Sequence, residues 1–110
     1  MTKGRSMEVD QYATITEDED RVEIAYWRRR DDLHVWMENL WNNKGGNGEF
    51  NGIEVELTLQ DLDQLEVDIN NENLSQDEYQ KSKDLSFIED ARARIAQGHN
   101  VFYSSWFENV

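Results

Sequence analysis

The stretch from Glu23 to Trp41 constrains the fold more than any other part of the sequence, because its hydrophobic period changes within a few residues. Val22, Ile24 and Tyr26 alternate with their neighbours, and this period of two predicts a strand over residues 22–28. Apolar residues then recur at helical spacing and form one stripe of an amphipathic helix. The stripe consists of Leu33, Trp36, Met37, Leu40 and Trp41. A strand that leads almost directly into a helix favours an α+β domain.

Two later segments predict further strands. Residues 53–57 alternate apolar side chains with glutamates, which is typical of a strand with one buried face and one face in water. Residues 101–107 are rich in aromatic and β-branched side chains, which strands favour. We therefore expect an α+β fold in which a small three-stranded sheet is packed by about three helices, in the order β-α-β-α-α-β.

Capping signals predict where the second and third helices begin. Thr58 and Asp61 have the spacing of a capping box, in which each side chain bonds to the backbone of the other residue. Ser75 and Glu78 repeat this spacing ahead of a third helix, which we expect to end just before Gly98. The predicted inward side of the third helix consists of Tyr79, Leu85, Ile88, Ala91 and Ile95.

We expect residues 1–20 to form a flexible acidic N-terminal arm and residues 21–110 to form a single α+β domain, since 110 residues suit one domain. The run Glu17–Asp20 places acidic residues side by side, and their repulsion favours disorder or an exposed turn. A short edge strand over residues 12–15 is the alternative within the arm.

The charge balance restricts the partners of this chain. Its 24 acidic residues against 11 lysines and arginines give a net charge of −13. Such a surface repels the phosphates of DNA, RNA and anionic membranes, but it admits a basic partner or mimicry of a polyanion. The absence of cysteine excludes disulfides and fits a reducing cytosol. No apolar run approaches the length of a membrane span.

Three short motifs, taken together, resemble a widespread family of small tailed-bacteriophage proteins. The sequence reads YWRR at 26–29 followed by LHVW at 33–36, then ELT leading into DLDQL across 56–65, and VFYSSW at 101–106. Members of that family share a Tyr-Trp-Arg-Lys start, an Ile/Leu-His-x-Trp/Phe helix and a Tyr-x-Ser-Ser-Trp ending. The resemblance implies a phage-encoded protein that acts in the host cytoplasm, and it implies no particular biochemical activity.

Two features separate this chain from what is said of that family. Many members carry the label phosphoglycerate kinase, but here the only glycine cluster, GGNG at 45–48, lies between a predicted helix and strand rather than ahead of a helix N-terminus. The family's Leu-Pro-x-x-x-Gly-Phe-Phe-Phe-Gly segment is missing, and the polar and acidic residues 70–80 stand in its place. If that segment carries the family's function, this chain lacks it.

The basic residues that follow the first strand have two interpretations. In the first, Arg28, Arg30 and His34 bind an anion such as a nucleotide or a cyclic-nucleotide signal, and Trp27 stacks on its base. In the second, the arginines pair internally, because acidic side chains surround them in excess. The sequence favours the second.

The tryptophans also have two interpretations. The stripe that contains Trp36 and Trp41 either packs against the sheet or forms an exposed partner-binding surface, since tryptophan is enriched at binding hot spots. The regular helical spacing favours packing. Trp106, near the end of the last strand, is a candidate for an exposed contact.

The acidic positions offer three interpretations. Glu54 and Glu56 on a strand, with Asp63 and Glu66 on the following helix, could bind a divalent cation, mimic DNA phosphates or simply be solvated. Because the chain has no Asp-x-Asp-x-Asp-Gly loop, we expect no metal site. A charge run is usually a solvated face.

We expect no enzyme activity and no cofactor. Ser104 and Ser105 lie in a predicted strand without a glycine elbow, so nothing presents them as nucleophiles. The acidic composition and the resemblance to phage proteins together favour a non-catalytic, phage-encoded acidic protein that binds a host protein with a basic surface and inhibits or redirects host transcription or defence. The alternatives are a nucleotide-binding signal sponge, a DNA-mimic inhibitor and a virion accessory protein.

Overall fold

A computed structural model describes residues 9–74 and 76–108. Over these residues the chain forms four strands and three helices. In chain order they are β1 Val9–Glu17, β2 Asp20–Arg28, α1 Asp31–Asn43, β3 Ile53–Leu57, α2 Leu59–Asn70, α3 Glu78–Ala96 and β4 Val101–Phe107.

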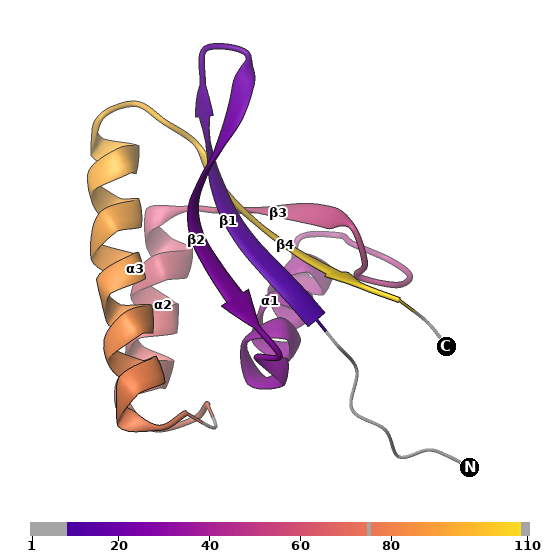
Figure 1. The fold of residues 1–110 in the computed structure, drawn as a ribbon, viewed down its shortest axis with the longest axis vertical. Coiled ribbons are helices and arrows are strands. Elements are labelled where there is room, and N and C mark those ends of the chain that lie inside the picture. The colour runs from indigo at the N-terminus through magenta and orange to yellow at the C-terminus, as the bar shows by residue number, and fades with distance from the viewer. Residues whose placement is uncertain (1–8, 75, 109–110) are drawn as a thin grey trace.

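The strands make one antiparallel sheet in the order β2-β1-β4-β3. All three described helices lie on one side of the sheet (Figure 1). The burial pattern agrees, because alternate residues along β1 are buried and the residues between them are only partly covered. The α+β class is confirmed, and the described part of the chain has one sheet face covered by helices and one face that none of them covers.

The predicted number of strands was wrong, because β1 lies within the segment expected to be a flexible arm. β1 is an interior strand that pairs with β2 on one side and with β4 on the other. Its inward residues include Gln11 and Ala13, which weaken the apolar alternation that marks a half-buried strand. The acidic run Glu17–Asp20 is exposed at the tip of the β1–β2 hairpin, which extends beyond the helices in Figure 1. Residues 1–8 of the expected arm lie outside the described residues.

The hydrophobic core fills the space between the helices and the sheet. From α1 it takes Leu33 and Met37, while Trp36 and Trp41 are partly buried and pack against its margin. Trp41 stacks on Phe50 with ring centroids 5.2 Å apart. The other large buried side chains are Ile15, Trp27, Leu57, Leu62, Leu65, Ile69, Ile88 and Tyr103.

The loop after α1 folds back against Trp41 and requires a glycine there. A Cβ atom added at Gly46 would lie 2.3 Å from the Trp41 ring, a distance that no side chain tolerates. The backbone N–H of Gly46 donates to the Trp41 carbonyl at 2.9 Å, which holds this close approach in place. Within the glycine cluster, Gly46 therefore allows the loop to pack against the Trp41 ring.

The third helix differs from its predicted pattern at its start. Its N-cap is Asp77, whose carboxylate accepts a hydrogen bond from the backbone N–H of Gln80 at 2.8 Å, and the proposed cap Ser75 lies outside the described residues. Tyr79 was predicted to point inward but is 76% exposed. The buried face of α3 begins five residues later, at Asp84, whose carboxylate accepts hydrogen bonds from Arg30 and Trp27, and it continues with Phe87.

The capping box at the start of α2 gives a first prediction. Thr58 Oγ1 accepts from the Asp61 N–H at 3.2 Å, and the Asp61 carboxylate accepts from the Thr58 N–H at 2.9 Å. Replacing Thr58 by alanine removes one acceptor, so Thr58→Ala should lower the free energy of unfolding by about 0.5–2 kcal/mol. Thr58→Ser keeps the hydroxyl and should stay within about 0.5 kcal/mol of the parent. Equal losses in both variants, measured by urea denaturation, would contradict the role of the cap.

Candidate functional site

The face of the sheet that no described helix covers is the candidate site, and we call it the open face. Side chains directly opposite each other on neighbouring antiparallel strands share a face. Tyr12 of β1 is partnered by Tyr26 of β2 and Ser104 of β4, and Asp10 by Arg28 and Trp106. By the same register the open face consists of Asp10, Tyr12, Thr14, Thr16, Arg21, Glu23, Tyr26, Arg28, Glu54, Glu56, Phe102, Ser104 and Trp106.

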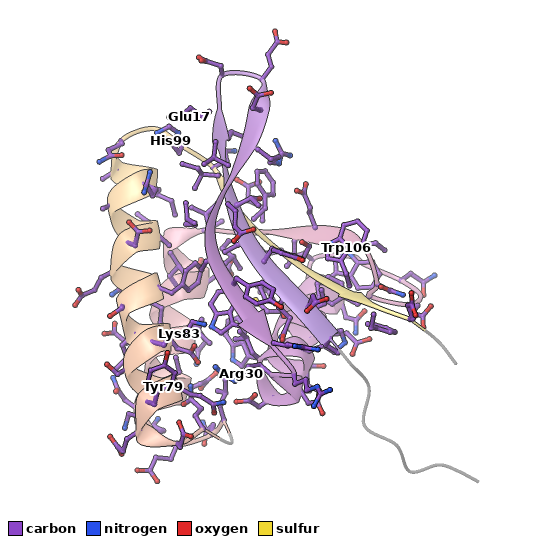
Figure 2. The ribbon with its side chains drawn as sticks, viewed as in Figure 1. Glu17, Arg30, Tyr79, Lys83, His99 and Trp106 are labelled. Carbon is purple, nitrogen blue, oxygen red and sulfur yellow. The ribbon has the colours of Figure 1, made fainter. Side chains whose placement is uncertain are left out.

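Aromatic side chains from three strands gather on the open face. The rings of Tyr12 and Tyr26 are 5.3 Å apart, and the Tyr26 hydroxyl donates to Asp10 at 2.7 Å. Trp106 is 51% exposed and is held in place by its indole N–H, which donates to Ser104 Oγ at 3.1 Å (Figure 2). Fixed, exposed aromatic rings offer contact area at low entropic cost.

One ion pair crosses the open face from edge to edge. Arg21 of β2 lies over the Phe102 ring, 4.2 Å from its centroid, and donates two hydrogen bonds of 3.1 Å to Glu54 of β3. These hydrogen bonds raise the pKa of Arg21 above its ordinary value. Because both side chains are exposed, the pair adds little to stability. It nevertheless covers Phe102 and leaves the tyrosines and Trp106 accessible.

The structure places four of the predicted contact residues on this face, namely Arg28, Glu54, Glu56 and Trp106. Glu54 pairs with Arg21, Glu56 accepts from the Asn100 side chain at 3.0 Å, and Trp106 is exposed beside them. On the whole face the carboxylates of Asp10, Glu23, Glu54 and Glu56 outnumber the guanidinium groups of Arg21 and Arg28. The open face is therefore aromatic and net acidic.

The proposed anion-binding corner does not form, because two of its residues are buried in an internal network. Arg30 donates to Asp84 at 2.7 Å and 3.1 Å and to Asp32 at 3.0 Å and 3.1 Å, and Trp27 donates its indole N–H to Asp84 at 2.9 Å. Burial opposes the charge on Arg30, but the hydrogen bonds to Asp84 and Asp32 outweigh it and raise the pKa of Arg30. The arginine is paired internally, so it is not available to a ligand.

A chain of neutral polar groups continues this network beneath the sheet. Gln11 donates to the Arg30 carbonyl at 2.9 Å and to the Tyr103 hydroxyl at 2.8 Å, and its side-chain oxygen accepts from the Arg30 N–H at 3.0 Å. The Tyr103 hydroxyl also bonds to Ser105 Oγ at 2.7 Å. Burial raises the pKa of Tyr103 to about 12. This polar network links the first, second and last strands to the start of α1.

The remaining members of the proposed corner lie apart from one another. Arg28 is exposed on the open face, where its backbone lies opposite Asp10. His34 is buried on the helix side between Phe50 and Phe107, whose ring centroids are 5.6 Å and 5.7 Å from that of the imidazole. Trp27, Arg28, Arg30 and His34 are therefore not gathered at one accessible place, which removes the support for nucleotide binding there.

The acidic residues of α2 are also engaged internally. Arg92 of α3 donates to Asp63 at 2.6 Å and to Glu66 at 2.8 Å, so these carboxylates join the two helices. This pairing weakens the interpretation of α2 as a row of free charges that mimics DNA. Among the described residues no cluster of three or more histidine and carboxylate side chains is placed to hold a metal ion.

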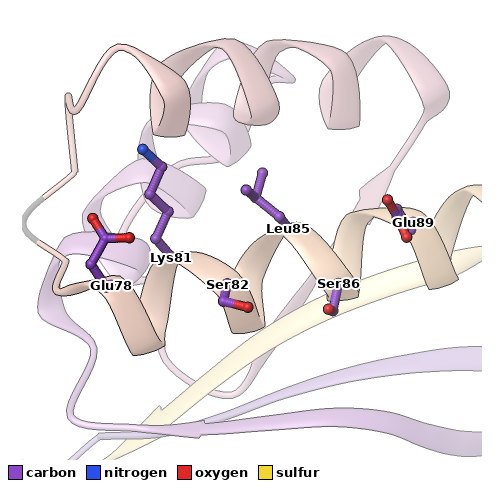
Figure 3. A pocket seen from close by; sticks show the side chains of 6 residues that line it. All are labelled: Glu78, Lys81, Ser82, Leu85, Ser86 and Glu89. Atoms are coloured by element: carbon purple, nitrogen blue, oxygen red, sulfur yellow. The ribbon is translucent and has the colours of Figure 1, made fainter.

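A shallow hollow of about 280 Å³ lies along α3. All of its lining side chains come from that one helix (Figure 3), so it can surround a ligand on one side only. They are Glu78, Lys81, Ser82, Leu85, Ser86 and Glu89. We assign this hollow no function.

Comparisons with known proteins do not identify the chain: no family model, no curated protein and no solved structure matches it. The resemblance to small phage proteins stays a prediction. Within residues 9–74 and 76–108 no helix is long and apolar enough to cross a bilayer.

The sequence did not predict that Asp10 and Tyr12 of β1 belong to the site, nor that Asp84 pairs with Arg30. The alternation over residues 9–17 was the available signal for Asp10 and Tyr12. The pairing of Asp84 with Arg30 could not be predicted from local patterns, because the two residues are 54 positions apart and only the fold brings them together.

The Arg30–Asp84 pair gives a second prediction. Asp84→Ala leaves a buried guanidinium with one acid and leaves the Trp27 N–H without an acceptor, so the free energy of unfolding should fall by about 3–5 kcal/mol. The matched control is Glu89→Ala, an exposed acid on the same helix, which should change it by less than about 0.5 kcal/mol. Similar small effects of both substitutions in urea denaturation would show that the network does not hold α3.

The buried His34 gives a third prediction. Its Nδ1 atom is buried without a hydrogen-bond partner, and burial lowers its pKa below the ordinary value of 6.5, although Glu38 and Asp31 on its own helix oppose this. Below pH 6.5, His34 is therefore protonated more in the unfolded chain than in the folded chain. The free energy of unfolding should decrease as the pH falls below 6.5.

The measurement is urea denaturation from about pH 7.5 to about pH 5.5, a window above the range in which carboxylates titrate. His34→Phe should lose most of this pH dependence, while the parent and the variant both keep His99. A slope that survives unchanged in His34→Phe would contradict the assignment.

Proposed function

We propose that this chain is a non-catalytic interaction protein that binds a partner protein with a basic surface through its open face. The observation that carries the proposal is a sheet face, uncovered by any described helix, on which Tyr12, Tyr26 and Trp106 stand among surplus carboxylates. Aromatic anchors supply much of the binding energy of protein interfaces, and complementary charges supply orientation and association rate.

The charge of the chain supports a basic partner in particular. The open face is net acidic, the exposed run Glu17–Asp20 adds charge at the hairpin tip beside it, and the whole chain carries −13. A nucleic acid would be repelled by the same groups. If the resemblance to phage proteins holds, the partner is a host protein in the host cytoplasm, and inhibition of transcription or of defence is the kind of effect that such binding would have.

The test uses a matched pair of exposed residues on the two sides of the molecule. Trp106 on the open face and Val67 on α2 are 51% and 49% exposed. A partner captured from lysate on the immobilised chain and then purified should lose affinity by about 30-fold or more with Trp106→Ala, which corresponds to about 2 kcal/mol. Val67→Ala should bind like the parent.

Two further readouts make the result specific. Thermal midpoints of both variants should stay close to that of the parent, so that lost binding is not lost folding. The association rate should fall as salt rises, because exposed charges are screened. Loss of binding with Val67→Ala and not with Trp106→Ala would contradict the proposal, as would an affinity that does not change with salt.

A further inference from the structure

A groove of about 580 Å³ runs between α1 and α2, on the helix side of the sheet and apart from the open face. It is lined by Trp36, Asn39, Leu40, Asn43, Lys44, Gln60, Asp61, Gln64 and Asp68. Its volume lies within the range of small-molecule sites.

Two contacts cross the groove and mark its ends. The Trp36 indole N–H donates to Asp68 at 2.8 Å, and Lys44 Nζ donates to Asp61 at 2.6 Å. Lys44, the C-cap of α1, pairs with Asp61 near the start of α2, whereas Trp36 of α1 pairs with Asp68 near its end, so the two helices run antiparallel. Trp36 and Lys44 are two helical turns apart, which sets a length of about 12 Å between the two crossings. The groove is therefore short, and one side-chain contact crosses it at each end.

The charged groups of the groove are already satisfied. Asp61 is paired with Lys44, and Asp68 accepts from Trp36, Gln64 and Asn73, the last two at 3.1 Å and 3.3 Å. Lys44 also donates to the Glu56 carbonyl, so its ammonium group already has two hydrogen-bond acceptors. In a chain of net charge −13 this surface has no free cation to attract an anion, which disfavours phosphate-bearing ligands.

What the groove offers to a ligand is a set of free carboxamides. Asn39 and Asn43 lie on the α1 side and Gln60 lies on the α2 side. None of their three side-chain amides has a hydrogen-bond partner in the described part of the chain. A carboxamide both donates and accepts. Trp36 and Leu40 supply apolar surface between the two polar walls. A matching ligand is neutral, has an apolar face, and carries groups that donate and accept along both of its edges.

We propose that this groove binds a short neutral saccharide of one or two pyranose rings. A pyranose has a face of C–H groups that can pack on an indole ring and a rim of hydroxyls that pair with carboxamides. The two crossing contacts are about 10–12 Å apart along the helices, so the space between them suits a ligand of one or two rings. An extended peptide would have to pass through the Trp36–Asp68 or Lys44–Asp61 contact. This site is independent of the interaction proposed for the open face.

The experiment is a titration of the full chain, labelled with ¹⁵N, against maltose, cellobiose, lactose and N,N′-diacetylchitobiose. At least one of these sugars should shift the side-chain amide signals of Asn39, Asn43 and Gln60 together with the Trp36 indole signal. Asn43→Ala and Gln60→Ala should each weaken the binding by about 10-fold, since each removes hydrogen bonds to the sugar. Both positions are exposed, so both variants should fold like the parent.

Asn70→Ala is the matched control, because Asn70 is an exposed asparagine at the end of α2 that does not line the groove. It should bind the sugar like the parent. The proposal is overturned if no sugar shifts these signals at about 50 mM, a concentration that would detect even millimolar affinity. It is also overturned if Asn43→Ala binds like the parent, or if uncharged nucleosides or a tripeptide shift the groove signals and the sugars do not.

Discussion

The buried pair of Arg30 and Asp84 is the interaction on which the arrangement of the fold depends. Arg30 stands where β2 passes into α1, and Asp84 lies on the inward face of α3. A buried charge must meet its partner in good geometry or destabilise the protein strongly. Asp84 also accepts from Trp27 and Gln76, and Gln11 bonds to the backbone of Arg30. These contacts tie the β1–β2 hairpin of the sheet to α1 and α3, which lie on one side of the sheet, so that its other face stays open.

One lysine side chain contacts a backbone carbonyl on each edge strand of the sheet. β2 and β3 are the edge strands. Lys83 of α3 donates to the Tyr26 carbonyl of β2 at 2.5 Å, and Lys44 donates to the Glu56 carbonyl of β3 at 2.6 Å. A lysine at an exposed edge opposes pairing with a strand of another chain. These two contacts disfavour strand pairing at the edges, which supports our proposal that a partner binds the open face.

Local sequence patterns predicted most of the helices and strands. They did not predict the contacts between residues that are distant in the sequence. The bounds of β3 and β4 and the capping box at Thr58 follow from periodicity and capping alone. β1 was not predicted as a full strand, because polar Gln11 and small Ala13 weaken its apolar alternation. The buried Gln11 side chain is satisfied by hydrogen bonds to Tyr103 and Arg30, which are distant in the sequence. For the site, the glutamates of β3 and Trp106 were predictable, whereas the tyrosines opposite each other on β1 and β2 required the register.

The most direct test of the central claim, that the open face meets the partner, is site-specific photocross-linking at two tyrosine positions. Tyr26 is 39% exposed on the open face. Tyr79 is 76% exposed and lies on α3, where Figure 2 labels it. Each is replaced in turn by p-benzoyl-phenylalanine, and the partner is added and irradiated. The account predicts a cross-link from position 26 and none from position 79. A cross-link from position 79 alone would place the partner on the helices and contradict the account.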